Sequence, residues 1–120
     1  MKYMLLVYHN EQSFAELGEA THVQMLEESI RLAHKITSGG QYLAAPLQPT
    51  STATCVQVRD GKHRVTDGPY AETKEQLAGY FLIDAKDLDQ AIGIAAQVPG
   101  ARIGTVEIRP VRDVPGLPTA

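Results

Sequence analysis

The sequence predicts an α+β fold, a ferredoxin-like sandwich with an inserted β-hairpin, in a single domain over residues 1–110. Strand-like apolar runs and helix-like segments follow one another as strand–helix–strand, and this order occurs twice. Between the two halves, Arg59-Asp60-Gly61-Lys62 separates two alternating runs and predicts a two-residue hairpin turn. A weakly ordered tail is expected over residues 111–120, where prolines recur.

The N-terminal run from Lys2 to Tyr8 is apolar after its first residue and rich in aromatic and branched side chains. It predicts a central strand of the sheet. Ser13 and Glu16 follow with the spacing of a capping box, which predicts a short helical turn that ends at Gly18.

The main helix is predicted to begin at a second capping box, Thr21 with Gln24, and to run to about Ser38, where Gly39-Gly40 would stop it. Its polar and apolar residues fall on opposite arcs, so the helix should cover a sheet. His22 lies near the centre of the apolar arc and should point toward the sheet from the first turn. The other members of that arc are Val23, Met25, Leu26, Ile30, Leu32, Ala33 and Ile36.

A short strand is predicted from Tyr42 to Ala45, followed by a loop from Pro46 to Pro49, because proline cannot take part in regular strand pairing. The runs Thr52–Val58 and His63–Thr66 form the hairpin. A turn at Asp60-Gly61 fixes its register. The predicted pairs are Arg59 with Lys62, Val58 with His63, Val56 with Val65 and Thr54 with Asp67.

The stretch after the hairpin predicts a rigid corner, a short helix and another strand. In Asp67-Gly68-Pro69 the glycine permits a positive φ, the proline fixes its own φ and the carboxylate can accept from backbone amides. Ala71 to Leu77 contains good helix formers, and Gly79 to Asp84 resumes a strand-like run.

The C-terminal half ends with a helix and a strand. Asp87 caps a second helix with core spacing, which Pro99-Gly100 would end. Ile103 to Arg109 predicts the last strand, with Val106 and Ile108 on one face.

Composition argues against several classes of partner. Eleven basic and fourteen acidic residues give a net charge of −3, so no excess positive charge is available to neutralise a nucleic-acid backbone. The longest apolar run, Met4 to Tyr8, is far shorter than the ~20 residues of a membrane-spanning helix. The N-terminus also lacks the apolar region of a signal peptide. We expect a cytoplasmic protein with no direct nucleic-acid or membrane partner.

No cofactor and no metal site are expected. The chain lacks a glycine-rich phosphate-binding motif, an HExxH motif and paired CxxC motifs. Asp84, Asp87 and Asp89 lack the glycine and terminal glutamate of a calcium-binding loop, so helix capping and solvation explain them better. Cys55, the single cysteine, cannot form an internal disulfide and is expected to be a buried, inert thiol.

Acid–base chemistry is the remaining possibility. Burial and a position at a helix N-terminus would keep His22 in its neutral, base-competent form. Asp67, held by a turn at the end of a strand, can orient an imidazole or act itself. Both also have structural interpretations, His22 as a core histidine and Asp67 as a turn carboxylate. The candidate substrate-binding residues are Tyr70 and Tyr8, while His9, His34 and His63 are interpreted as structural.

The segments MKYMLLVY, TATCVQVRDGK, VTDGPYAETKEQLAGYFLID and ARIGTVEIRPV cover much of the chain. They resemble the YCII-related proteins of the DGPF type. Tyr70 stands where that type usually has phenylalanine, and Ala45-Pro46-Leu47 stands where Glu-Gly-Leu is more frequent.

The resemblance implies a dimeric α/β barrel built from two sheets, and therefore a homodimer. It also implies a His–Asp pair in a cleft, carried here onto His22 and Asp67, and one relative resembles a dehydrochlorinase. Three functions stay open. The chain is a cofactor-free lyase, isomerase or dehydrochlorinase, or a ligand-binding regulatory protein linked to extracytoplasmic-function sigma factors, or an interaction dimer without a ligand.

Overall fold

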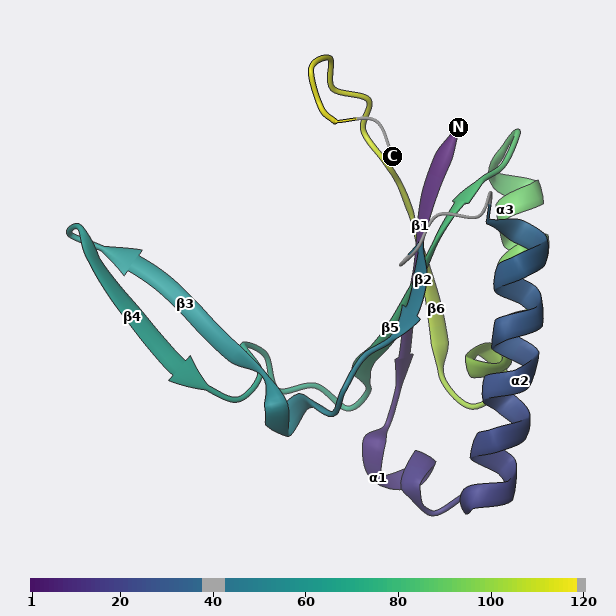
Figure 1. Ribbon diagram of the computed structural model, residues 1–120, viewed down its shortest axis with the longest axis horizontal. Helices are drawn as coiled ribbons and strands as arrows, with labels where there is room; N and C mark the ends of the chain where they lie inside the picture. The colour runs from purple at the N-terminus through teal and green to yellow at the C-terminus, as the bar shows by residue number, and fades with distance from the viewer. Residues whose placement is uncertain (38–42, 119–120) are drawn as a thin grey trace.

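The computed structural model describes residues 1–37 and 43–118. The strands are β1 (Lys2–His9), β2 (Ala44–Pro46), β3 (Thr54–Arg59), β4 (Lys62–Asp67), β5 (Gln76–Asp84) and β6 (Thr105–Pro110). The helices are α1 (Glu11–Ala15), α2 (Glu19–Ile36) and α3 (Leu88–Ala95), with 3₁₀ turns η1 (Thr50–Thr52) and η2 (Pro99–Arg102). Within the described residues, an antiparallel sheet of order β2-β5-β1-β6 has α2 and α3 on one side, and β3 pairs only with β4 (Figure 1). This α+β arrangement is compatible with the predicted ferredoxin-like sandwich.

The core lies between the four-stranded sheet and the two longer helices. Alternate residues of β1 point into it, so Tyr3, Leu5 and Val7 are buried, and β1 is central as predicted. The other residues of the core are Leu32 of α2, Phe81 and Ile83 of β5, Ala91 and Ala95 of α3, and Ala85 and Val98. The intervening β1 residues Met4, Leu6 and Tyr8 therefore face the other side of the sheet, as does Leu82 of β5, which pairs with Met4. We call this side the free face.

Both predicted capping boxes near the N-terminus are wrong, whereas the cap of α3 is confirmed. Asn10 caps α1, because its Oδ1 accepts from the amide of Ser13 at 2.8 Å. α2 begins earlier than predicted because Gly18, at φ 86°, turns the chain before Thr21. Asp87 caps α3 by accepting from the Gln90 amide at 2.8 Å. The predicted stop at Gly39-Gly40 lies outside the described residues.

The apolar arc of α2 is only partly covered. Leu32 is buried, but Val23, Leu26 and Ile30 are about half exposed. The prediction that the whole arc packs on the sheet is therefore wrong between Val23 and Ile30, where a pocket separates the helix from the strands.

The hairpin register is confirmed at every predicted pair, from Arg59 with Lys62 to Thr54 with Asp67. Asp60 and Gly61 both have positive φ, 51° and 72°, as a type I′ turn requires. The hairpin does not join the main sheet, however, and none of its strand residues is buried. We call residues Thr54–Asp67 the arm.

Two predictions around the arm are corrected. Residues 71–75 form no helix, and β5 already begins at Gln76. The segment is held open by Asn10, whose Nδ2 donates to the Lys74 carbonyl at 2.9 Å. β2 includes Pro46, which pairs with Gly79 at the edge of the sheet, where a missing N–H is tolerated. Tyr42, the predicted start of that strand, lies outside the described residues.

Candidate functional site

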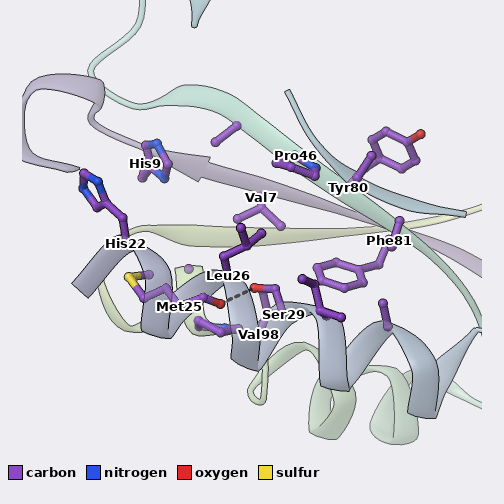
Figure 2. Close-up of a pocket in the computed structure, with 18 of the residues that line it drawn as sticks. Val7, His9, His22, Met25, Leu26, Ser29, Pro46, Tyr80, Phe81 and Val98 are labelled. Atoms are coloured by element: carbon purple, nitrogen blue, oxygen red, sulfur yellow. Dashed lines mark hydrogen bonds between the residues drawn. The ribbon is translucent and has the colours of Figure 1, made fainter. Parts of the chain in front are cut away.

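A pocket of about 190 Å³ lies between the N-terminal half of α2 and the sheet (Figure 2). Most of its wall is apolar, with residues from β1, α2, β2, β5 and the segment before η2. The principal apolar side chains are Val7, Met25, Leu26, Ile30, Phe81 and Val98. The pocket can therefore hold a small, mainly apolar molecule.

Three stacked rings form the polar end of this pocket. The ring centroids of His9 and Phe14 are 4.3 Å apart at an interplanar angle of 4°, and those of Phe14 and His22 are 4.2 Å apart at 7°. All three residues line the pocket. Because Phe14 stacks with both imidazoles in near-parallel planes, they lie on opposite faces of its ring. We call these residues the ring stack.

The local backbone brings the ring stack together. His9 is the last residue of β1, and His22 lies in the first turns of α2. The Asn10 cap begins α1 directly after the strand, and Gly18 reverses the chain before α2. The end of the strand and the start of the helix must therefore lie close together, with Phe14 of α1 between them.

The His22 ring is held in one orientation by the backbone. Its Nε2 lies 2.5 Å from the carbonyl oxygen of Phe14. Since a carbonyl can only accept, Nε2 is the donor, and the Nδ1 of a neutral ring is left as a proton acceptor.

Burial lowers the pKa of His9 below its usual 6.5, because the charged imidazolium loses hydration. The nearby carboxylates of Glu11 and Glu75 oppose this shift, and His22 adds slightly to it. The balance favours a neutral imidazole at physiological pH. His9 is therefore able to accept a proton from a bound molecule.

The two carboxylates near His9 are tied to neighbouring segments. Glu11 accepts from the Thr50 amide at 3.0 Å and from the Thr50 hydroxyl, and these hydrogen bonds lower the pKa of Glu11. Glu75 Oε1 accepts from the Thr105 hydroxyl at 2.8 Å. The Glu11 amide donates to Gln76 Oε1 at 2.9 Å. The end of β1 is thus linked to the segments at both ends of the arm.

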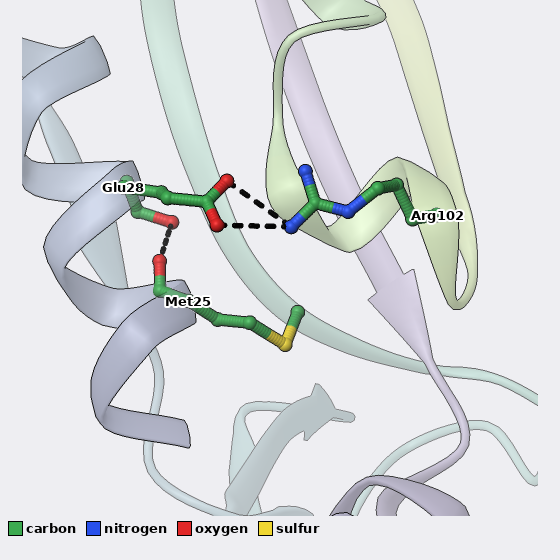
Figure 3. A network of polar contacts seen from close by, with 4 residues as sticks. Met25, Glu28 and Arg102 are labelled. Atoms are coloured by element: carbon green, nitrogen blue, oxygen red, sulfur yellow. Dashed lines mark hydrogen bonds and ion pairs between the residues drawn. The ribbon is translucent and has the colours of Figure 1, made fainter. Parts of the chain in front are cut away.

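The helix side of the pocket is braced by polar contacts on α2. Arg102 of η2 donates through one guanidinium nitrogen to both carboxylate oxygens of Glu28, at 3.1 and 3.2 Å (Figure 3). Ser29 donates to the Met25 carbonyl at 2.9 Å, so its hydroxyl is engaged along the helix (Figure 2). The contact between Glu28 and Arg102 joins α2 to η2, whose Pro99 and Gly100 line the pocket.

The structure brings only one of the four predicted site residues into the pocket. His22 lines it. Asp67 is the exposed last residue of β4, and Figure 1 places the arm on the side of the sheet away from α2, so His22 and Asp67 share no pocket within one chain. Tyr70 is 84% exposed, and Tyr8 belongs to the free face. Within one chain the predicted His22–Asp67 pair does not form, because the hairpin is a separate arm and not a layer of the core.

His9 and Phe14 were not predicted as site residues. For His9, a signal was available in its position. His9 ends a strand, and His22 lies near the start of the helix that follows after a short connection. A short connection between a strand and a helix packed on it places those two ends together.

The described residues contain no group of three or more His, Cys, Asp or Glu side chains arranged to hold a metal ion. Cys55 is half-buried, and its Sγ lies 3.2 Å from the Gly68 carbonyl, to which the thiol donates. No helix within residues 1–37 and 43–118 is both long and apolar enough to cross a membrane.

Comparison with known proteins places nearly the whole chain in one family. The YCII-related domain matches residues 1–115. A protein of Rhizobium meliloti (strain 1021), itself described as uncharacterized, is 32% identical over 114 residues, which cover 92% of this chain and 92% of that protein. The chain therefore belongs to the family of YCII-related domain proteins.

Proposed function

We propose that this chain is a cofactor-free enzyme of lyase or isomerase type that removes a proton from a small, mainly apolar molecule. The observation that supports the proposal is the ring stack, which provides two imidazoles at one end of an apolar pocket. Asp67 lies outside that pocket in its own chain, so the proposal assigns the role of second group to His9 instead.

The proton acceptor is His9, whose lowered pKa keeps it neutral. His22 offers a second acceptor at Nδ1, because its Nε2 is engaged by Phe14. Two acceptors and an apolar wall suit a weakly acidic ligand, such as a phenol or a ketone with an acidic C–H bond. A dry cavity of ~150 Å³ accepts benzene, so 190 Å³ fits one six-membered ring with small substituents.

The lyase and the isomerase reactions begin with the same chemical step, the removal of a proton from carbon. His9 takes the proton, and the electrons of the C–H bond form a carbon–carbon double bond. In a lyase, a leaving group departs with its bonding electrons, and this group is chloride in a dehydrochlorinase. In an isomerase, a double bond already present in the molecule breaks as the new one forms, and its electrons bind the same proton at a different carbon. Neither version needs an oxidant, a reductant or a metal.

The test begins with a thermal-shift screen of single-ring phenols, cyclic ketones and their chlorinated forms. A compound bound only by the folded chain raises the melting temperature. Each stabilising compound is then assayed for chloride release and for isomer formation, with His9→Phe as the test variant, because phenylalanine preserves the stack on Phe14 but cannot accept a proton. His34→Gln, on the exposed face of α2, is the matched control. Stabilisation with turnover that persists in both variants would contradict the assignment of the site.

The second candidate is a non-catalytic ligand-binding or regulatory dimer, as the resemblance to proteins linked with extracytoplasmic-function sigma factors implies. The engagement of His22 Nε2 by a backbone carbonyl favours it, because that nitrogen is then not free for chemistry. Stabilisation by a compound without any turnover would decide for this candidate. The absence of stabilisation by any compound would contradict both candidates.

We also infer that the chain forms a homodimer and belongs to the DGPF type. The corner at Asp67-Gly68-Pro69 and the following AETKEQ run support the subtype. The free face supports the dimer, because Met4, Leu6 and Leu82 remain partly exposed there without a covering layer among the described residues. Two such faces packed together would close an α/β barrel.

A further inference from the structure

We propose that the arm of one copy packs its valine side chains against α2 of a second copy and so forms part of the wall of that copy's pocket. This inference rests on the homodimer proposed above. It adds the arm as a second interface and makes each pocket incomplete without the other chain.

The arm carries an apolar face that no described residue of its own chain covers. Val56, Val58 and Val65 lie on one face by register and are 62%, 54% and 61% exposed. On the other face, Cys55 and Gln57 are partly covered. A two-stranded hairpin alone is marginally stable in water at best. We therefore expect a partner to cover the exposed apolar face of the arm.

The whole chain exposes more surface than a compact monomer. Its accessible surface is 8838 Å² at a mass of 13.0 kDa, whereas a compact monomer of this mass exposes ~6,300 Å². Its radius of gyration is 16.1 Å, against ~13.6 Å for a compact domain of this length. The excess, ~2,500 Å², is similar to the area that each chain buries in a large obligate dimer.

The position of the arm indicates where it reaches. Figure 1 shows it extending from the side of the sheet opposite α2, which is the side of the free face. A second copy seated on the free face therefore lies beside the arm. A six-residue strand spans ~20 Å, and packed sheets lie ~10 Å apart. The arm is thus long enough to pass the partner's sheet and reach its helix layer.

The matching surface in that layer is the exposed part of the apolar arc of α2. Val23, Leu26 and Ile30 are 48%, 49% and 48% exposed and lie along one side of the helix at i, i+3 and i+7. Leu26 and Ile30 also line the pocket. The chain's own arm cannot cover them, because it lies on the opposite side of the sheet.

Charge also allows a second copy as the partner, whereas a strongly basic partner would be repelled by the arm. The arm contains three basic and two acidic residues and has a net charge of +1. Because the whole chain has a net charge of −3, the rest of the chain has a net charge of −4. α2 has three acidic residues and two basic ones, Arg31 and Lys35, so its own net charge is −1. An arm with a net positive charge is attracted to the negatively charged remainder of a second copy.

The test is disulfide cross-linking between two co-expressed chains, both carrying Cys55→Ser to remove the native thiol. One chain has an affinity tag and Val58→Cys on the arm, and the other has Leu26→Cys on α2. After mild oxidation with copper phenanthroline, we expect a cross-linked product of twice 13.0 kDa on a non-reducing gel, which reductant removes. The matched control replaces Val58→Cys with Gln57→Cys, the adjacent residue on the opposite face of the arm.

The outcomes separate the arm contact from the dimer itself. A product with Val58→Cys and much less with Gln57→Cys supports the arm contact. Equal products from both, or none from either while light scattering shows a dimer, overturn the arm contact and leave the dimer standing. A chain of about 13 kDa in light scattering with no cross-linked product overturns both the dimer and the arm contact.

Discussion

At neutral pH the imidazole of His9 is favoured in its uncharged form, because burial lowers its pKa from 6.5 and the carboxylates of Glu11 and Glu75 reverse only part of that shift. Phe14 stacks on it from one side, so the ring has a defined orientation. A neutral, oriented imidazole at the end of an apolar pocket has the properties of a general base.

His9→Phe should abolish that chemistry while leaving the fold intact. A phenyl ring preserves the stack on Phe14 but cannot accept a proton. For any compound that the wild-type chain turns over, we expect the rate to fall by about 10²–10⁴-fold, the usual contribution of a general base. Steady-state kinetics with His34→Gln as the control provides the measurement. A loss of less than tenfold would remove His9 from the mechanism.

The same residue should make stability depend on pH. The unfolded chain binds this proton near pH 6.5, and the folded chain binds it only at lower pH, so acidification through this window favours unfolding. The contribution is fully present above about pH 6.5 and declines below it. Urea unfolding of the wild type and of His9→Phe from about pH 5.5 to 8 checks this. The wild type should lose more stability than the variant as the pH falls.

At the scale of elements, the segments at the two ends of the arm are fixed by short polar contacts and not by a core. Glu11 binds Thr50 before β3, and Asn10 binds the Lys74 carbonyl before β5. These contacts determine how residues 47–53 and 68–75 leave the sheet. They also explain why the helix formers after Ala71 adopt no helix, since long-range hydrogen bonds can override local propensity.

Glu11→Ala should loosen this connection. It removes a charged acceptor of two hydrogen bonds at a partly exposed position, so we expect a loss of about 1 kcal/mol in unfolding free energy. Because the folded pKa of Glu11 is lowered from 4.5, this stabilisation is present above about pH 4.5 and is lost as the pH falls further. Gln12→Ala, exposed on the same helix, is the control for urea unfolding. Equal effects of the two variants would argue against the connection.

Two glycines should respond in opposite directions to alanine. Gly93 lies inside α3, and a β-carbon built there meets no atom within 4 Å, so Gly93→Ala should stabilise by about 0.5–1 kcal/mol. At Gly104 the same atom would lie 2.0 Å from the Tyr8 carbonyl oxygen, so Gly104→Ala should destabilise by at least about 2 kcal/mol. Thermal unfolding measures both. A stable Gly104→Ala variant would contradict the close packing of η2 and β6 on β1.

At the scale of the whole molecule, the helices within residues 1–37 and 43–118 cover one side of the sheet and leave the other side without a helix. The free face, the arm and the exposed side of α2 are three separate apolar surfaces in one chain. A symmetric dimer can cover all three with one operation, because each copy supplies both partners of every contact.

Leu82→Lys should separate the dimer without unfolding the monomer. Leu82 lies in a central strand on the free face, opposite Met4 of β1, and is partly exposed, so a lysine there can reach water in a monomer but would be buried without a partner in the dimer. We expect dimerisation to weaken by about 3 kcal/mol or more, over 100-fold in Kd. Ala96→Lys, an equal charge change on the helix side, is the control. Sedimentation showing an unchanged dimer for Leu82→Lys would exclude the free face as the interface.

The sequence by itself determined the parts that depend on near neighbours. The strand from Lys2, the hairpin register around Asp60-Gly61 and the cap at Asp87 were all predicted, because period-two alternation, turn chemistry and capping act within a few residues.

Tertiary structure alone decided the direction of the arm and the composition of the pocket. The register placed Asp67 opposite Thr54 but could not say that the hairpin leaves the sheet, because residues 47–53 and 68–75 have no periodic pattern and are positioned by contacts with Asn10 and Glu11. For the same reason, the sequence predicted His22 as a site residue but did not predict which side chains lie beside it. His9 and Phe14 join it only where the end of a strand meets the start of a helix, and local propensity does not encode that contact between segments.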